Sequence, residues 1–212
     1  MCLKITTQKL LAAYVLGYFP MAENQDAKEL SWHKPEWRSI IPLSHFKISK
    51  SLLQVIKKNI FEIKINTNFR EVITQCANRN ETWISEEIID LYTSAFEKGH
   101  AMSVECYQNN ELVGGLYGIK IHHAFFGESM FSKVSNASKV ALVFLVDYLR
   151  KNNYRLLDTQ YINEHTAQFG AMEIPVNIYE IILQDALAGF NIQKLYKGDW
   201  DKWEDYLEFN RI

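Results

Sequence analysis

Hydrophobic residues recur with helical spacing in four segments of the first half of the chain, at about residues 7–17, 49–59, 68–78 and 85–99. Ser85 is predicted to cap the fourth helix and Gly99 to end it in a left-handed conformation. Asn66, Thr67 or Asn68 is predicted to cap the third. Residues 61–66 alternate in polarity, as a strand does.

The middle of the chain changes to the two-residue period of β-strands. Residues 102–107, 112–119 and 124–130 have strand composition, and Asn109 and Asn110 between the first two are typical turn residues. We predict an antiparallel meander of three strands. The pattern then predicts a long helix from Asn136, followed by a buried strand over residues 155–162 that lies beside the meander. Two further helices are predicted over residues 163–170 and 175–187.

This order of elements is that of the fold named after GCN5-related N-acetyltransferases, in which a mixed sheet is flanked by helices. Residues 19–42 carry three of the four prolines and are predicted to be irregular. We therefore expect an α+β protein with a small N-terminal subdomain over residues 1–44. An acetyltransferase-like (acyl-CoA N-acyltransferase-like) domain over residues 45–212 is expected to follow.

Composition narrows the class of protein without naming a function. With 48% hydrophobic and 13% aromatic residues and only 9 Gly and 4 Pro, the 212-residue chain is predicted to be globular. Its net charge of -2 disfavours nucleic-acid coating by bulk charge. The longest apolar run, Val140 to Val146, is far shorter than the roughly 20 residues of a membrane helix. We expect a cytoplasmic monomer without membrane contact.

Cysteine and histidine spacing argues against a metal site. Cys2, Cys76 and Cys106 share no C-x-x-C spacing, and the 6 histidines show no i, i+4 pair. We expect free thiols and no metal. The segment before the long helix, residues 131–140, contains no glycine, so a coenzyme A pyrophosphate loop is not expected either. No cofactor is predicted.

Two sets of side chains are candidates for chemistry. Asp158 and Gln160 are two residues apart in a predicted buried strand and so share a face, where a carboxylate is costly without a partner or a purpose. Phe126, Glu128 and Met130 share a face by the same rule. An acid between apolar side chains suits an amino acid with a hydrophobic side chain and a free ammonium. For Asp158 and Gln160 the alternative is a polar pair that satisfies buried backbone groups. For Phe126 and Met130 it is ordinary core packing.

Two further features leave alternatives open. Gly114, Gly115 and Gly118 lie in a predicted strand, where glycine marks close approach of a ligand or of another backbone segment. Lysines Lys50, Lys57 and Lys58 form a stripe on one predicted helix. Such a stripe is either a solvated face or a surface that contacts phosphates.

Several longer motifs add a resemblance to a family. The motifs LLAAY, GYFPMA, W-x-x-PEWR, TWI, GHAMSVE, LVGGLYG, FFGESMFS, NASK, LLDTQ and GAMEIP follow one another from about Leu11 to Tyr179. Together they closely resemble the leucyl/phenylalanyl-tRNA-protein transferases. The resemblance implies transfer of leucine or phenylalanine from aminoacyl-tRNA to the N-terminus of proteins that begin with Lys or Arg. Such a transfer marks the acceptor for degradation by the N-degron route.

The resemblance also implies roles for particular residues. Gln160 would align the attacking amine, while Asp158 would fix the amide of Gln160 and offer negative charge. The aminoacyl group would lie among Leu116, Phe126, Glu128 and Met130, with Glu128 holding its ammonium, and Trp32 or Trp83 would stack on the terminal adenine. The chain departs from the family pattern at His33, Trp37, Met102 and Val176.

Other functions remain as alternatives. A related transferase could use acidic N-termini as acceptors. A coenzyme A-dependent acetyltransferase would share the fold, and a catalytically silent tRNA-binding protein would share the surface. The presence of both Asp158 and Gln160 argues against the silent protein.

Overall fold

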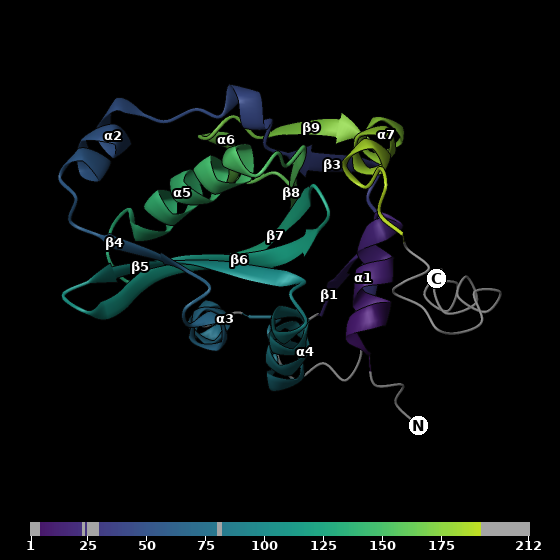
Figure 1. Ribbon diagram of the computed structural model, residues 1–212, viewed down its shortest axis with the longest axis horizontal. Helices are drawn as coiled ribbons and strands as arrows, with labels where there is room; N and C mark the ends of the chain where they lie inside the picture. The colour runs from purple at the N-terminus through teal and green to yellow at the C-terminus, as the bar shows by residue number, and fades with distance from the viewer. Residues whose placement is uncertain (1–4, 23, 25–29, 80–81, 192–212) are drawn as a thin grey trace.

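The computed structural model describes residues 5–22, 24, 30–79 and 82–191. It contains a seven-stranded sheet in the order β4-β5-β6-β7-β8-β3-β9 and a two-stranded sheet of β1 and β2 (Figure 1). The strands are β1 (Phe19–Met21), β2 (Ser31–His33), β3 (Trp37–Ile40), β4 (Glu62–Ile65), β5 (Ala101–Gln108), β6 (Glu111–Ile121), β7 (Ala124–Ser132), β8 (Leu156–Gln160) and β9 (Met172–Pro175). The helices are α1 (Thr7–Val15), α2 (Lys50–Lys57), α3 (Phe69–Ala77), α4 (Glu86–Glu97), α5 (Ala137–Lys151), α6 (Glu164–Ala167) and α7 (Val176–Ala186), with a 3-10 turn η1 (Leu43–His45).

The predicted helices are confirmed, and the fourth begins and ends at the residues expected to bound it. The hydroxyl of Ser85 accepts from the backbone N–H of Ile88 at 3.4 Å, and Gly99 ends the following helix at a φ of +81°. The start of α3 differs. Its N-cap, Asn68, makes no side-chain cap, and the buried carboxylate of Glu105 in β5 accepts from the backbone N–H of Asn68 at 3.0 Å instead. The expectation of a local side-chain cap is therefore wrong.

The main sheet separates two cores (Figure 1). Helices α3 and α4 cover one face and α5 covers the other. Tyr14 of α1, Tyr92 of α4 and Phe126 of β7 belong to the first core, and Leu116 of β6 and Leu145 of α5 to the second. The result is a mixed α+β architecture with a mostly antiparallel sheet flanked by helices, as predicted at that level.

The predicted meander is present as β5, β6 and β7, which pair antiparallel. Helix α5 then crosses over the sheet, and β8 pairs parallel with β7, so the buried strand lies beside the meander as expected. This parallel pairing is short: it joins Ala124–Phe126 to Leu156–Asp158. Beyond those residues the two strands separate.

The segment predicted to be irregular contains three short strands. Strands β1 and β2 form the small sheet, whereas β3 pairs antiparallel with both β8 and β9 inside the main sheet. Strand β3 is four residues long and carries a fully buried arginine, Arg38, so its polarity does not follow a simple alternation. Residues 37–40, from the predicted N-terminal subdomain, therefore lie within the main sheet.

The glycines of β6 make room for the protein's own backbone. A Cβ on Gly118 would lie 2.2 Å from the carbonyl oxygen of Phe126, and one on Gly114 would lie 2.4 Å from Cβ of Ala137 at the start of α5. Of the two alternatives left open by the sequence, close approach of another segment is therefore the one observed.

Within the described part of the chain, no helix combines the length and apolar character needed to cross a membrane. The same residues contain no group of three or more His, Cys, Asp or Glu side chains placed to hold a metal ion. Cys76 and Cys106 are buried free thiols, and Cys2 lies outside the described residues.

Candidate functional site

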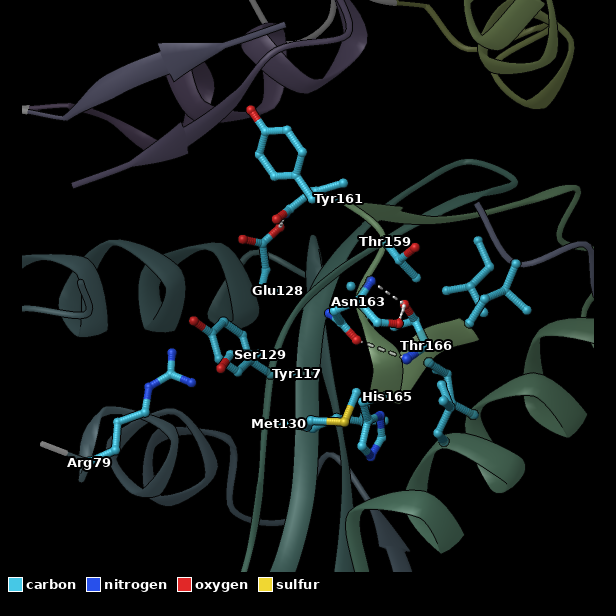
Figure 2. Close-up of a pocket in the computed structure, with 17 residues that line it drawn as sticks. Arg79, Tyr117, Glu128, Ser129, Met130, Thr159, Tyr161, Asn163, His165 and Thr166 are labelled. Carbon is cyan, nitrogen blue, oxygen red and sulfur yellow. Dashed lines mark hydrogen bonds between the residues drawn. The ribbon is translucent and has the colours of Figure 1, made fainter. Parts of the chain in front are cut away.

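A cavity of about 310 Å³ opens where β7 and β8 separate. Residues after Phe126 on one strand and after Asp158 on the other line its two sides (Figure 2). One part of its wall is apolar and comes from the sheet, the loop after β3 and α5: Ile41, Leu116, Met130, Leu142, Leu145 and Leu157. The other part is polar and includes Glu128, Gln160 and the exposed Arg79.

A β-bulge at Glu128 shapes this wall. Gly127 pairs with Gly118 and Ser129 pairs with Tyr117, so Glu128 has no partner in the ladder. The extra residue turns Ser129 toward the α3 side and Met130, paired with Leu116, toward the α5 side. The prediction that Phe126, Glu128 and Met130 share one face is therefore wrong for Met130, because a bulge changes the alternation.

Glu128 connects three side chains at the polar end of the cavity. Its Oε1 accepts from the hydroxyl of Tyr14 at 2.6 Å and from the amide nitrogen of Gln160 at 3.2 Å. Its Oε2 accepts from the hydroxyl of Tyr92 at 3.0 Å, and the two tyrosine hydroxyls are 2.7 Å apart. Burial raises the pKa of Glu128 to about 7; the charge of Asp158 also raises it, and the hydrogen bonds lower it.

Asp158 lies behind the cavity wall, where it is fully buried. Arg38 binds both of its oxygens, through Nε at 3.0 Å and Nη2 at 2.7 Å, and the hydroxyl of Tyr179 donates to Oδ2 at 2.6 Å. The backbone N–H of Gln160 donates to Oδ1 at 2.7 Å. Arg38 also donates to the carbonyl oxygen of Gly17 at 3.2 Å. The carboxylate of Asp158 is thus saturated by its own neighbours.

Gln160 has an unusual backbone. Its φ of +63° is in the left-handed region, which a non-glycine residue adopts at some cost. The bond from its N–H to Asp158 and the bond from its carboxamide to Glu128 hold it there. The expectation that Asp158 fixes the carboxamide is wrong: Asp158 fixes the backbone, and Glu128 contacts the carboxamide.

A model of the leucyl/phenylalanyl-tRNA protein transferases matches residues 40–184, and the model of the N-terminal domain of the same family matches residues 4–36. This chain belongs to that transferase family. It is 50% identical over 188 residues to the leucyl/phenylalanyl-tRNA–protein transferase of Paramagnetospirillum magneticum, a match covering 87% of this chain and 90% of the relative. The transferases of Gloeobacter violaceus, 48% identical over 89% of this chain and 97% of the relative, and Rhodopseudomonas palustris, 46% identical over 87% and 82%, are similar. The chain is therefore an aminoacyltransferase.

The transferase brings together only part of the predicted substrate site. Leu116, Glu128 and Met130 line the cavity. Phe126 does not: it is fully buried, and its ring packs against Tyr14 with centroids 4.8 Å apart. Phe126 therefore supports the wall from behind, and the expectation that it lines the pocket is wrong.

The predicted nucleic-acid contacts lie away from the cavity wall. Trp32 in β2 and Trp83 before α4 are half-buried and pack against the same core as Tyr14. Lys50, Lys57 and Lys58 are exposed along α2 and its C-terminal cap, which lie on the α5 side of the sheet (Figure 1). Their roles stay predictions.

Sequence reasoning missed most of the transferase's polar scaffold. Tyr14, Tyr92, Arg38 and Tyr179 come from four different elements, and no motif joins them. The hydroxyl of Tyr117 in the cavity wall is buried and has no hydrogen-bond partner among the described residues. Figure 2 shows Tyr117 next to Ser129, on the side of the cavity where Arg79 lies. An arginine inside a strand of otherwise apolar or small residues was the available signal for Arg38.

Proposed function

We propose that this transferase moves leucine or phenylalanine from aminoacyl-tRNA to the α-amino group of proteins that begin with Lys or Arg. The new N-terminal residue then acts as a degradation signal. One observation carries the proposal: the cavity between β7 and β8 has an apolar wall at one end and the Gln160–Glu128 pair at the other.

The apolar wall fits the side chain of the donor. Leu116 and Met130 from the sheet and Leu142 and Leu145 from α5 line the apolar part of this cavity, whose whole volume is about 310 Å³. A leucyl or phenylalanyl side chain gains roughly 1.5–3 kcal/mol when such a wall removes it from water. The same wall disfavours donor residues with charged side chains, because an apolar wall offers no partner for a buried charge.

Glu128 supports binding of the donor's amino group. An ionised carboxylate has about four acceptor positions. Tyr14, Tyr92 and Gln160 occupy three of them. A position therefore remains for the ammonium of the aminoacyl ester, beside the apolar wall that takes its side chain.

Gln160 supports alignment of the attacking amine. The aminoacyl ester is already activated, so catalysis consists mainly of holding amine and carbonyl in line, an effect that supplies roughly 7–11 kcal/mol. A neutral carboxamide binds and orients an amine but accepts its proton poorly. Asp158 acts one step back, since its hydrogen bond to the backbone of Gln160 fixes where the carboxamide lies.

The remaining parts of the proposal concern the frame and the tRNA. The separation of β7 from β8 supports an acetyltransferase-like fold, in which acyl donor and amine meet at a gap in the sheet. Trp32 and Trp83 would stack on the terminal adenine, and Lys50, Lys57 and Lys58 would contact phosphates. The enzyme would act as a monomer without a cofactor.

A second candidate differs in the acceptor. Arg79 lines the cavity just after the C-cap of α3, and its guanidinium takes part in none of the ion pairs among the described residues. A cation at this position would repel an acceptor that begins with Lys or Arg and attract one that begins with Asp or Glu. This observation favours a transferase for acidic N-termini.

The test is transfer of radiolabelled leucine from leucyl-tRNA to peptides that differ only in a first residue of Arg, Lys, Asp or Glu. Label in the Arg and Lys peptides is expected, and a peptide acetylated at its N-terminus is the matched control. Label confined to the Asp and Glu peptides would select the second candidate. Label in none of them would contradict both.

A further inference from the structure

We propose that Tyr14, Tyr92 and Glu128, here called the Tyr-Tyr-Glu cluster, form the proton acceptor for the transfer reaction. The inference rests on the proposed function and deepens it. An N-terminal amine has a pKa near 7.7–8.0, so it arrives at pH 7 mostly as an ammonium and must lose a proton before it attacks. Gln160 aligns this amine and takes none of its protons.

The cluster contains fewer protons than contacts. Its three oxygen–oxygen distances are 2.6 Å for Tyr14 to Glu128, 3.0 Å for Tyr92 to Glu128 and 2.7 Å between the hydroxyls, all within hydrogen-bond range. The two tyrosines contribute two hydroxyl protons. With an ionised Glu128, one of the three contacts therefore lacks a proton. A third proton on the carboxyl group turns every contact into a hydrogen bond, so the cluster can hold this proton without losing a contact.

The cluster reaches the place where the amine is aligned. Oε1 of Glu128 is 3.2 Å from the amide nitrogen of Gln160, and both side chains line the cavity. An amine held by the carboxamide oxygen of Gln160 would lie next to this carboxylate. Proton transfer requires such hydrogen-bond reach before a suitable pKa matters.

The pKa of Glu128 lies near neutral pH. Burial, and after it the charge of Asp158, raise its pKa to about 7. Arg38 is bound to Asp158, Tyr117 faces the cluster from β6 and Arg79 lines the cavity from the end of α3. A base with a pKa near the working pH is both ionised often enough and basic enough to accept a proton.

The proton balance of the step is complete. The amine nitrogen attacks the ester carbonyl, a C–N bond forms and the bond from the carbonyl carbon to the ribose oxygen breaks. Starting as an ammonium, the nitrogen loses two protons. One neutralises the leaving ribose oxygen, and the other passes to Glu128 and from there to solvent when product leaves.

The test measures single-turnover transfer from leucyl-tRNA to one peptide between pH 5.5 and 9 for wild type, Tyr14→Phe, Tyr92→Phe and Glu128→Gln. The acceptor contributes the same ionisation to every profile, so differences belong to the enzyme. The wild-type rate should rise tenfold per pH unit below about 7. Each tyrosine hydroxyl lowers the pKa of Glu128 by its hydrogen bond. Removing one hydroxyl should therefore move the rising part of the pH profile to higher pH.

Glu128→Gln should abolish the rise of the rate with pH that Glu128 causes and slow transfer by about 10²–10⁴-fold, the usual contribution of a general base. Tyr148→Phe, a half-buried tyrosine on α5 outside the cluster, is the matched control and should reproduce the wild-type profile. Thermal melting checks that each variant is folded. If Glu128→Gln does not fold, the two tyrosine variants decide.

Superimposable profiles for wild type and both tyrosine variants would overturn the inference, as would a Glu128→Gln enzyme that keeps this rise with pH and more than a tenth of the rate. A wild-type enzyme that transfers leucine to no peptide would refute the proposed function and the inference together. An active wild type with unmoved profiles would refute the inference alone.

Discussion

Replacing Arg38 by methionine leaves the Asp158 carboxylate buried without its cation. Both side chains are almost fully buried, at 1% and 0% exposure, and the guanidinium contacts both carboxylate oxygens. Removing one partner of such a pair typically destabilises a protein by about 3–5 kcal/mol. The hydroxyl of Tyr179 and the N–H of Gln160 still stabilise the carboxylate, so we expect a value at the lower end of that range, about 3 kcal/mol.

The assay is urea unfolding of wild type, Arg38→Met, Asp158→Leu and the double variant. Because apolar replacement of a whole buried pair is often nearly neutral, the double variant should be more stable than the sum of the single changes predicts. It should also transfer leucine at least about 10²-fold more slowly, since the backbone of Gln160 loses its acceptor. The exposed pair Lys151–Asp147 is the control, and Lys151→Met should change stability by about 0–1 kcal/mol. A destabilisation below about 1 kcal/mol for Arg38→Met, or a fully active double variant, would refute the reasoning.

Three further changes test the rest of the site. Gln160→Ala should slow single-turnover transfer by about 10²-fold or more with charged tRNA still bound, because alignment of the amine is lost; near-normal rates would remove Gln160 from the mechanism. Glu128→Gln should weaken binding of an aminoacyl-adenosine analogue, and unchanged affinity in a titration would exclude Glu128 as the anchor of the donor's amino group. Changing Lys50, Lys57 and Lys58 to Gln should weaken tRNA binding. The slope of log binding constant against log salt concentration should become shallower by about 0.7–0.9 for each phosphate that these lysines neutralise, whereas an unchanged slope would identify the stripe as a solvated face.

Most of the fold follows from periodicity because most elements obey one period throughout. The helices keep an apolar stripe, and the three meander strands keep turn residues between them. Strands β1, β2, β3 and β9 have three or four residues each and do not lie in a longer alternating segment, unlike the equally short β4, which alternation over residues 61–66 predicted. Strand β3 is also joined to β8 by the ion pair of Arg38 with Asp158, two residues separated by 120 positions in the chain.

The parts of the site that depend on residues close together in the sequence could be predicted, and the parts that depend on contacts between distant segments could not. Two-residue spacing placed Asp158 and Gln160 in one strand, but the positive φ of Gln160 changes what each of them contacts. A bulge at Glu128 likewise moved Met130 to the other face. Bulges and left-handed residues depend on the partner strands, so local alternation does not reveal them.

Contacts across the small N-terminal part of the chain bear on where its boundary lies. Tyr14 of α1 completes the Tyr-Tyr-Glu cluster, and the carbonyl oxygen of Gly17 accepts from the guanidinium of Arg38, which holds Asp158. Both routes lead to Gln160, one through its carboxamide and one through its backbone. A division of the chain at residue 44 would therefore separate β8 from Tyr14, Gly17 and Arg38. Residues of the N-terminal segment therefore lie on both hydrogen-bonded routes to Gln160.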